Sequence, residues 1–312
     1  MIVAVDIGGT QMRVAILDNY LNVLSRESVP TGIDSRADDS CRLMIQMIDS
    51  GRRQVGLEVL SGVGISAPSV DRRSGSLINP PNLPNWHGYS ISKFVKNQLG
   101  LPVFIGNDAS LAALGEHRLG AGNGVENMLY YTLSTGIGGG IIIGGRLYEG
   151  KTGFAGEFGH MTVDPEGRAC KCGNRGCLEL YASGPSIVKE AWQAMENGRA
   201  TSLSREGTPS TLSVFEASGT GDGLCSEVIG RAGKYLGIGI LGVMHAFEPE
   251  RIVIGGGVSA GFDQLIPYVE QHVRDHAMAQ FKGNMDIRVA ALGEDSSLIG
   301  AACYLSDNLH TP

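Results

Sequence analysis

The apolar positions of the chain fall into short runs that end in glycines. Residues 2–7 (IVAVDI) are apolar apart from one acid, Gly8, Gly9 and Thr10 follow, and a second apolar run, VAILD, comes after them. Residues 129–147 repeat this order with LYYTLS, a glycine-rich turn and IIIGGRLY. Each stretch predicts two strands joined by a glycine turn. Since the second stretch follows the first by about 125 residues, the pattern indicates a duplicated unit.

Between these stretches lie segments with the apolar spacing of three and four positions that is typical of helices. Residues 199–223 are rich in Ser, Thr and Gly and are expected to form an exposed loop or a helix-capping linker. Strands that alternate with helices predict an α/β fold. Helices are predicted at residues 37–50, 109–118 and 226–247, and short buried strands at residues 61–67, 101–106 and 251–256.

Length and charge limit the possible functions. A chain of 312 residues with 42% hydrophobic and 18% charged positions is expected to be globular, with roughly two domains. The net charge is −7 and there is no basic run, so a nucleic-acid partner is not expected. The longest apolar stretch, residues 235–247, is shorter than the roughly 20 residues of a membrane span, and residues 1–10 resemble a strand rather than a secretory signal. A cytoplasmic protein without a membrane partner is therefore expected.

One short segment contains three of the six cysteines and a histidine: His160, Cys170, Cys172 and Cys177. In a reducing compartment, clustered thiols are more often metal ligands or catalysts than disulfides. Three thiolates and one imidazole form the closed four-ligand set of a structural zinc site, which leaves no open position for water. The alternative is a disulfide between Cys172 and Cys177, or reduced thiols without a metal.

The glycine turns are candidate phosphate sites. Backbone amides at Gly8 and Gly9 can approach a phosphate closely, Asp6 can hold a hydrated Mg²⁺, and Thr10 can donate a hydroxyl hydrogen bond. A glycine hairpin without a ligand is the alternative. A second turn at residues 134–136 would clamp a polyphosphate from the other side, and the glycines at 255–257 offer a surface suited to a flat adenosine.

Asp108 follows the apolar run LPVFI and precedes the helical segment ASLAALGEH. A carboxylate at the start of a helix is stabilised by the helix dipole, and Asp is a preferred N-cap, so a capping role is one interpretation. The other is a general base that accepts the proton of an attacking hydroxyl.

Two glutamates flank the histidine and cysteine segment. If a metal orders this segment, Glu157, His160 and Glu179 lie at one site, where the carboxylates accept hydrogen bonds from the hydroxyls of a polyhydroxylated substrate. A metal-bound His160 keeps one ring nitrogen, whose N–H points at a fixed acceptor. The alternative is that both glutamates are solvated surface charges.

With these motifs in this order, the chain resembles the ROK family of sugar kinases over nearly its whole length. The residues that carry the resemblance are DIGGT at 6–10, NPPNLPNW at 79–86, GND at 106–108, STGIGGG at 134–140, GEFGH at 156–160, CKCGNRGC at 170–177 with LE at 178–179, and IGGGVS at 254–259.

The resemblance implies an α/β, two-domain fold of the actin and hexokinase type (ribonuclease H-like), with a cleft between duplicated domains and a small zinc-bearing loop. The domains would be residues 1–117 with 299–312, and residues 118–298. It further implies a homodimer or homotetramer that transfers the γ-phosphoryl group of ATP·Mg²⁺ to a hexose hydroxyl, usually the 6-OH, with glucose as the expected hexose. Asp108 would match the catalytic base. Sugar contacts would be Asn82, Asn107, Asp108, Glu157, His160 and Glu179, and nucleotide contacts Asp6, Gly8, Gly9, Thr10, Thr135, Gly136, Gly256 and Gly257.

The chain departs from the family pattern at two places. Gln11 stands where many members have lysine, and Ser69 stands where a sugar-facing glycine is usual, so the preferred hexose stays open. N-acetylglucosamine, mannose or fructose could replace glucose, and polyphosphate could replace ATP. A sugar-sensing regulator is a further alternative, although such proteins usually have a DNA-binding extension before the first phosphate strand, and an actin-like assembly protein is another.

Overall fold

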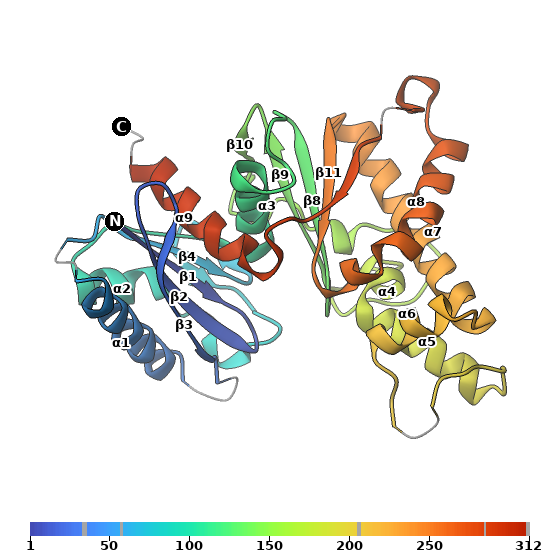
Figure 1. The fold of residues 1–312 in the computed structure, drawn as a ribbon, viewed down its shortest axis with the longest axis horizontal. Coiled ribbons are helices and arrows are strands. Elements are labelled where there is room, and N and C mark those ends of the chain that lie inside the picture. The colour runs from blue at the N-terminus through green and yellow to red at the C-terminus, as the bar shows by residue number, and fades with distance from the viewer. Residues whose placement is uncertain (33–35, 57–58, 205–206, 284, 310–312) are drawn as a thin grey trace. The chain divides into compact units, whose positions relative to one another are not determined.

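The computed structural model describes residues 1–32, 36–56, 59–204, 207–283 and 285–309 (Figure 1). The chain forms two compact units. The first comprises residues 1–126, 140–156 and 290–312, and the second comprises residues 127–139 and 157–289. None of the helices in the described ranges is both long enough and apolar enough to cross a bilayer.

The first sheet has the strand order β3-β2-β1-β4-β7. β1 pairs antiparallel with β2, as predicted for a strand, glycine turn and strand, and parallel with β4, which in turn pairs parallel with β7. The strands are β1 (Ile2–Ile7), β2 (Gln11–Leu17), β3 (Val23–Pro30), β4 (Val63–Ala67) and β7 (Val103–Asn107), and a separate hairpin contains β5 (Val70–Asp71) and β6 (Ser76–Leu77).

The second sheet repeats the first. Its order is β10-β9-β8-β11-β12, so the strands take the same relative places along the chain, and β11 pairs parallel with both β8 and β12. The predicted duplication is therefore confirmed. The strands are β8 (Met128–Leu133), β9 (Ile137–Ile143), β10 (Arg146–Leu147), β11 (Arg251–Gly255) and β12 (Ile287–Val289).

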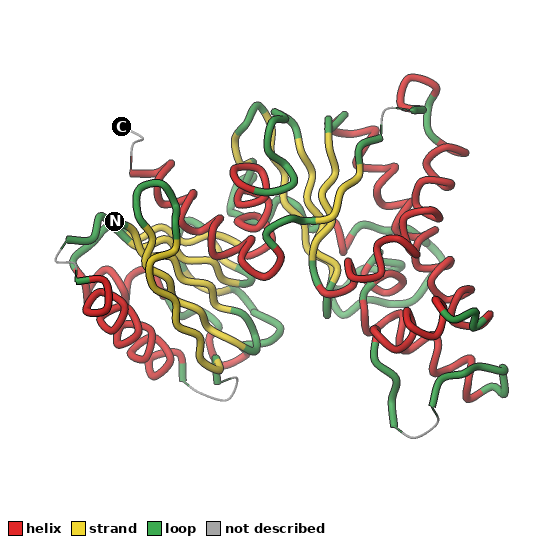
Figure 2. The backbone as a smooth tube through the Cα atoms, in the orientation of Figure 1, coloured by secondary structure: helices red, strands yellow, loops and turns green. Residues whose placement is uncertain are grey.

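The helices separate the strands in the chain, as Figure 2 shows by colour. The three predicted helices are present, and each extends one to five residues further than its apolar pattern. The first unit has α1 (Ala37–Val55), α2 (Ile91–Leu99), α3 (Asp108–Leu119) and α9 (Ser296–Leu309), and the second has α4 (Glu179–Ala182), α5 (Gly184–Glu196), α6 (Thr211–Gly219), α7 (Gly223–Phe247) and α8 (Phe262–His276). Short 3₁₀ turns lie at Pro84–Trp86, Phe158–His160, Gly257–Gly261, Ala279–Phe281 and Gly293–Asp295.

The prediction that residues 199–223 form a loop or linker is wrong for residues 211–219, which form α6. Ser210 caps this helix, because its hydroxyl accepts the Ser213 amide while the Ser213 hydroxyl accepts the Ser210 amide. The cap and the buried side chains of Val214 and Phe215 outweigh the poor helix propensity of the serines and glycines nearby. The same segment does cap a helix at Asp222, which accepts the Cys225 amide at the start of α7.

Glycines allow α9 to pack directly on the first sheet and on α3. A Cβ on Gly64 of β4 would lie 2.0 Å from the carbonyl oxygen of Ala301, and one on Gly300 would lie 1.7 Å from that of Leu111. No side chain can replace hydrogen at these positions without moving a backbone. Close packing of this kind fixes the position of α3, which begins at the predicted site residue Asp108.

Candidate functional site

The first glycine turn joins β1 to β2, and a network of hydrogen bonds fixes the acid that precedes it. Asp6 is 4% exposed, and its Oδ2 accepts the Arg13 guanidinium at 2.7 and 3.2 Å. Its Oδ1 accepts the Ser66 hydroxyl at 2.7 Å. Thr31 stabilises the turn, because its hydroxyl donates to the carbonyl of Gly8 at 2.7 Å. The turn is therefore rigid and preorganised.

The turn also contacts a predicted sugar-binding residue. A Cβ on Gly9 would lie 2.6 Å from the Cβ of Asn82, so the backbone at Gly9 approaches this side chain as closely as a glycine allows. The DIGGT and NPPNLPNW motifs, more than seventy positions apart, are thus neighbours in the first unit. The need for a glycine at this position comes from that contact.

Asp108 begins α3 directly after β7, as predicted. The N-cap is the preceding residue: the Asn107 Oδ1 accepts the amides of Ala109 and Ser110 at 3.0 and 3.2 Å. The interpretation of Asp108 as the N-cap is therefore wrong, although its own Oδ1 accepts the Ala109 amide at 2.8 Å. Because Asn107 caps the helix, the half-buried Asp108 carboxylate occupies the first helical turn, where the dipole stabilises its charge.

The second glycine turn, between β8 and β9, contacts the carboxylate at the start of α4. The Ile137 amide donates to the Glu179 Oε2 at 3.0 Å, and a Cβ on Gly136 would lie 2.5 Å from the same oxygen. Gly256 borders this region, because it has a φ of +85° and a Cβ there would lie 2.4 Å from the Leu133 carbonyl oxygen. The second unit thus gathers the Thr135–Gly136 turn, the Gly256–Gly257 turn and Glu179.

Glu157 and His160 belong to the same group of side chains. The turn that contains them packs against β9, because a Cβ on Gly159 would lie 2.1 Å from the Ile137 carbonyl oxygen. The His160 Nε2 lies 4.0 Å from the Glu157 Oε2. Partial burial raises the pKa of Glu157, nearby His160 opposes the rise, and Glu179 adds to it. The three predicted residues are therefore close neighbours. The interpretation as a solvated surface charge is wrong for Glu179, which accepts the Ile137 amide, whereas the Glu157 side chain is exposed.

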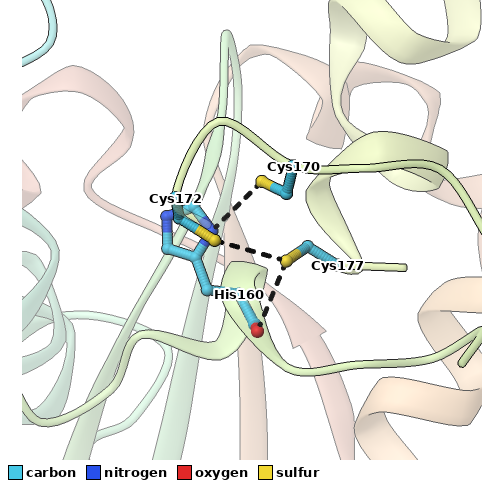
Figure 3. Close-up of side chains that lie close together, drawn as sticks. All are labelled: His160, Cys170, Cys172 and Cys177. Carbon is cyan, nitrogen blue, oxygen red and sulfur yellow. Dashed lines mark hydrogen bonds between the residues drawn. The ribbon is translucent and has the colours of Figure 1, made fainter. Parts of the chain in front are cut away.

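The four predicted metal ligands converge on one point, as Figure 3 shows. Their ligand atoms all lie within 4.8 Å of one another. The His160 Nδ1 faces the thiols, 3.9 Å from the Cys170 Sγ, and the Cys172 and Cys177 sulfurs are 3.6 Å apart. All three cysteines are free thiols, so the alternative of a disulfide between Cys172 and Cys177 is wrong.

These distances fit a tetrahedral zinc ion. Zinc bonds of about 2.3 Å to sulfur and about 2.0 Å to nitrogen give ligand–ligand edges of roughly 3.5 to 3.8 Å, close to the two separations above. The loop is shaped for this by glycines: Gly173 and Gly176 have φ of +96° and +66°, and a Cβ on Gly176 would lie 1.7 Å from the Asp164 carbonyl oxygen. The Cys₃His cluster therefore fits a structural zinc site.

Sequence reasoning missed the residues that hold Asp6. Arg13 lies directly opposite Asp6 in the antiparallel pair of β1 and β2, and Ser66 lies beside it in the parallel pair of β1 and β4. The first contact was available from the hairpin, because a tight turn fixes which residues face each other. The second was not, because β4 is almost sixty residues away.

Comparison with known proteins gives the family. The model of the ROK family matches residues 2–308. A glucokinase of Halalkalibacterium halodurans is 34% identical over 96% of this chain and 92% of its own length. The ROK hexokinase of Thermus thermophilus superposes with a TM-score of 0.84 at 33% identity, over 98% of this chain and 99% of its own. A ROK family glucokinase of Streptomyces griseus, solved with glucose and AMPPNP, gives 0.79 at 32% identity, over 96% of this chain and 97% of its own.

These likenesses confirm the expected α/β fold of the actin and hexokinase type with a zinc-bearing loop. The match covers both units and every motif described above. The chain belongs to the ROK family.

Proposed function

We propose that this protein is an ATP-dependent glucose kinase that phosphorylates the 6-hydroxyl group. The observation that carries the proposal is the likeness over 96% of this chain to a ROK glucokinase solved with glucose and AMPPNP. The site chemistry supports it, because each unit holds a glycine turn for phosphate together with polar side chains suited to hydroxyls. The proposed sugar contacts are Asn82, Asn107 and Asp108 in the first unit and Glu157, His160 and Glu179 in the second.

Asp108 is the proposed general base. Its half-buried carboxylate lies in the first turn of α3, where it would accept the proton of the attacking 6-hydroxyl as the new O–P bond forms and the bond from the γ-phosphorus to the ADP oxygen breaks. Glu157 and Glu179 accept hydrogen bonds from other sugar hydroxyls and orient the ring. Catalysis by positioning of this kind depends on how rigidly these groups are held.

The nucleotide side of the proposal uses the two glycine turns and the Gly256–Gly257 turn beside the adenosine. The Gly8 amide donates to the Gln11 carbonyl at 2.9 Å and the Ser134 amide to the Gly136 carbonyl, so other amides of the two turns would face the phosphates. Mg²⁺ would neutralise the charge that develops on the phosphoryl oxygens. Asp6 fits a hydrated Mg²⁺, because each carboxylate oxygen has two lone pairs and Oδ1 accepts only the Ser66 hydroxyl among the hydrogen bonds found in the described ranges. The hydrogen bonds from Arg13 orient this carboxylate.

The proposed role of zinc is positioning. Metal binding through Nδ1 fixes the imidazole of His160 with its Nε2–H toward Glu157 and the sugar. The metal would supply this orientation and hold the loop, because its four ligands leave no position for substrate.

The test is the steady-state rate of ATP-dependent glucose phosphorylation by wild type and Asp108→Asn. Removal of a general base should lower kcat by about 10²- to 10⁴-fold with a small change in the KM for glucose. Asp39→Asn is the control, because it makes the same change on an exposed carboxylate in the first turn of α1. Near-normal turnover by Asp108→Asn would contradict the role of the base.

The preferred sugar and phosphoryl donor are the least constrained parts of the proposal. Ser69 has a φ of +53°, in the left-handed region that glycine adopts most readily, and compared with a glycine it adds a hydroxymethyl group at this position. Rates with glucose, N-acetylglucosamine, mannose and fructose, each with ATP or polyphosphate, would identify the pair used. We further propose a cytoplasmic homodimer or homotetramer, for which light scattering of the purified protein gives the mass.

A further inference from the structure

A cavity of about 480 Å³ lies in the first unit, and none of its lining residues belongs to the proposed sugar or nucleotide site. Its walls come from the turn between β5 and β6, the beginning of α2, the strand β7 and the helix α9. Its volume falls in the range of about 300–1,000 Å³ that is usual for small-molecule sites. A cavity of this volume can hold a small metabolite.

The charge of this cavity is positive. Arg72, Arg73, Lys93 and Lys96 line it, and no aspartate or glutamate does. Arg72 forms a salt bridge with Glu149 at 3.0 Å, whereas the other three form no salt bridge with any residue in the described ranges. Arg73 also interacts electrostatically with the Asp71 carboxylate. In a chain with a net charge of −7, this concentration of cations favours an anionic ligand.

The start of α2 adds donors to the same wall. Ser90 is the N-cap, but its hydroxyl donates to the Ser74 carbonyl oxygen at 3.0 Å and makes no capping bond to the helix. Lys93 and Lys96 are three positions apart and therefore share one face of the helix. Lys93 lies near the start of the helix, where the dipole is positive and reinforces its charge, whereas Lys96 lies in the last turn.

The remaining lining suits a ligand that carries hydroxyls as well as phosphate. The hydroxyls of Ser90 and Ser92 lie 3.5 Å apart, and Asn308 and the ring of Tyr304 lie on the opposite helix. Tyr304 is held in place, because its hydroxyl donates to the Glu149 Oε1 at 2.9 Å. Such a wall offers hydrogen bonds to the polar part of the ligand and an aromatic surface to its carbon atoms.

We propose that this cavity binds a small phosphate-bearing molecule, with the phosphate at the cations and the rest of the molecule against the serines, Asn308 and Tyr304. Residues of β7 line the cavity as far as Ile105. Asp108 follows Ile105 by three residues, a distance of about 10 Å in an extended chain. A ligand here therefore contacts the strand that ends directly before the proposed base, without occupying the place of that base. The site is suited to regulation of the activity by a phosphorylated metabolite or by polyphosphate.

The test is calorimetric binding of three probes, glucose 6-phosphate, inorganic phosphate and tripolyphosphate, to the full chain saturated with glucose and AMPPNP. Wild type should bind at least one probe at one equivalent, and the probe that binds identifies the source of the phosphate. Lys93→Gln/Lys96→Gln should weaken that binding at least about tenfold, because each charged hydrogen bond is worth about 1.5–3 kcal/mol. The matched control is Lys189→Gln/Lys282→Gln, which removes two exposed charges from the second unit and should leave binding unchanged.

Three results would overturn the proposal. The first is that no probe binds wild type, and the second is that Lys93→Gln/Lys96→Gln binds the probe as tightly as wild type. The third is that glucose and AMPPNP displace the probe completely. Tighter binding of a single-stranded oligonucleotide than of every probe would also overturn it in favour of a nucleic-acid surface. The readout is binding, so the result stands whether or not the chain phosphorylates glucose.

Discussion

Glu116 should be among the costliest side chains to change in the first unit, although it lies outside every proposed site. This carboxylate on α3 is fully buried and accepts four hydrogen bonds. Its Oε2 accepts the amides of Ala121 and Ala291 at 2.8 and 2.9 Å. Its Oε1 accepts the Leu292 amide and the Ser296 hydroxyl, both at 2.8 Å. It therefore fastens the segment before α9 to α3.

Glu116→Gln keeps the shape and removes the charge. The best orientation points the new amide group at the Ser296 hydroxyl, which can rotate to accept from it and donate to the Gly293 carbonyl. The Leu292 amide then faces another donor and loses its partner, which costs about 1–3 kcal/mol. The hydrogen bonds from the Ala121 and Ala291 amides then end on a neutral oxygen, and each becomes weaker by roughly 1 kcal/mol. Because Ala291 is exposed, a hydrogen bond from its amide to water offsets part of this loss. We expect a total loss of about 2–4 kcal/mol.

The assay is urea unfolding followed by tryptophan fluorescence in a Trp192→Phe background. Trp86 is then the only tryptophan, and it is buried in the core of the first unit, so the signal reports the unit that contains Glu116. With a slope of about 3 kcal/mol/M, the midpoint should fall by roughly 1 M. Glu27→Gln, the same change on an exposed strand residue, should shift it by less than about 0.2 M. Equal shifts for the two variants would refute the reasoning.

Three further predictions follow from the contacts described above. Cys172→Ser, at the exposed ligand, should reduce zinc from about one per chain by elemental analysis and raise the KM for glucose; full zinc content would contradict the ligand set. Partial burial acts to raise the pKa of Asp222, but hydrogen bonds led by that from the Cys225 amide have a larger opposite effect, so the net pKa is lowered. The contribution of Asp222 to stability is therefore present above about pH 4 and is lost as the pH falls. The difference between the urea midpoints of wild type and Asp222→Asn should therefore be full at pH 7 and should begin to shrink as the pH falls below about 4. Gly9→Ala should lower kcat/KM for glucose at least about tenfold by displacing Asn82, whereas Gly223→Ala, which meets no atom within 4 Å, should not; equal rates would disprove the close contact.

The sequence by itself determined the local elements. A continuous apolar run identified β1, which is buried along its whole length, and its recurrence identified the duplication. Helical apolar spacing identified α1 and α7, because burial of one face imposes that period, although both helices extend beyond the predicted ranges. The spacing of His160 and the three cysteines identified the zinc ligands, since few functions besides metal binding require that set. The sequence pattern did not predict α6, because its helix depends on a capping box between Ser210 and Ser213 and on burial of Val214 and Phe215.

Only the tertiary structure decided which distant residues meet. Asn107, not Asp108, caps α3, and this became visible only in the direction of the two side chains. Ser66 reaches Asp6, Asn82 meets Gly9, and Glu179 accepts the Ile137 amide because sheet pairing and close glycine packing bring together segments that are tens of residues apart. The cavity at α2 arises in the same way, from four segments whose cations are unremarkable in the sequence. Local periodicity specifies an element, but the partner of a side chain depends on how elements pack, and that information is spread over the whole chain.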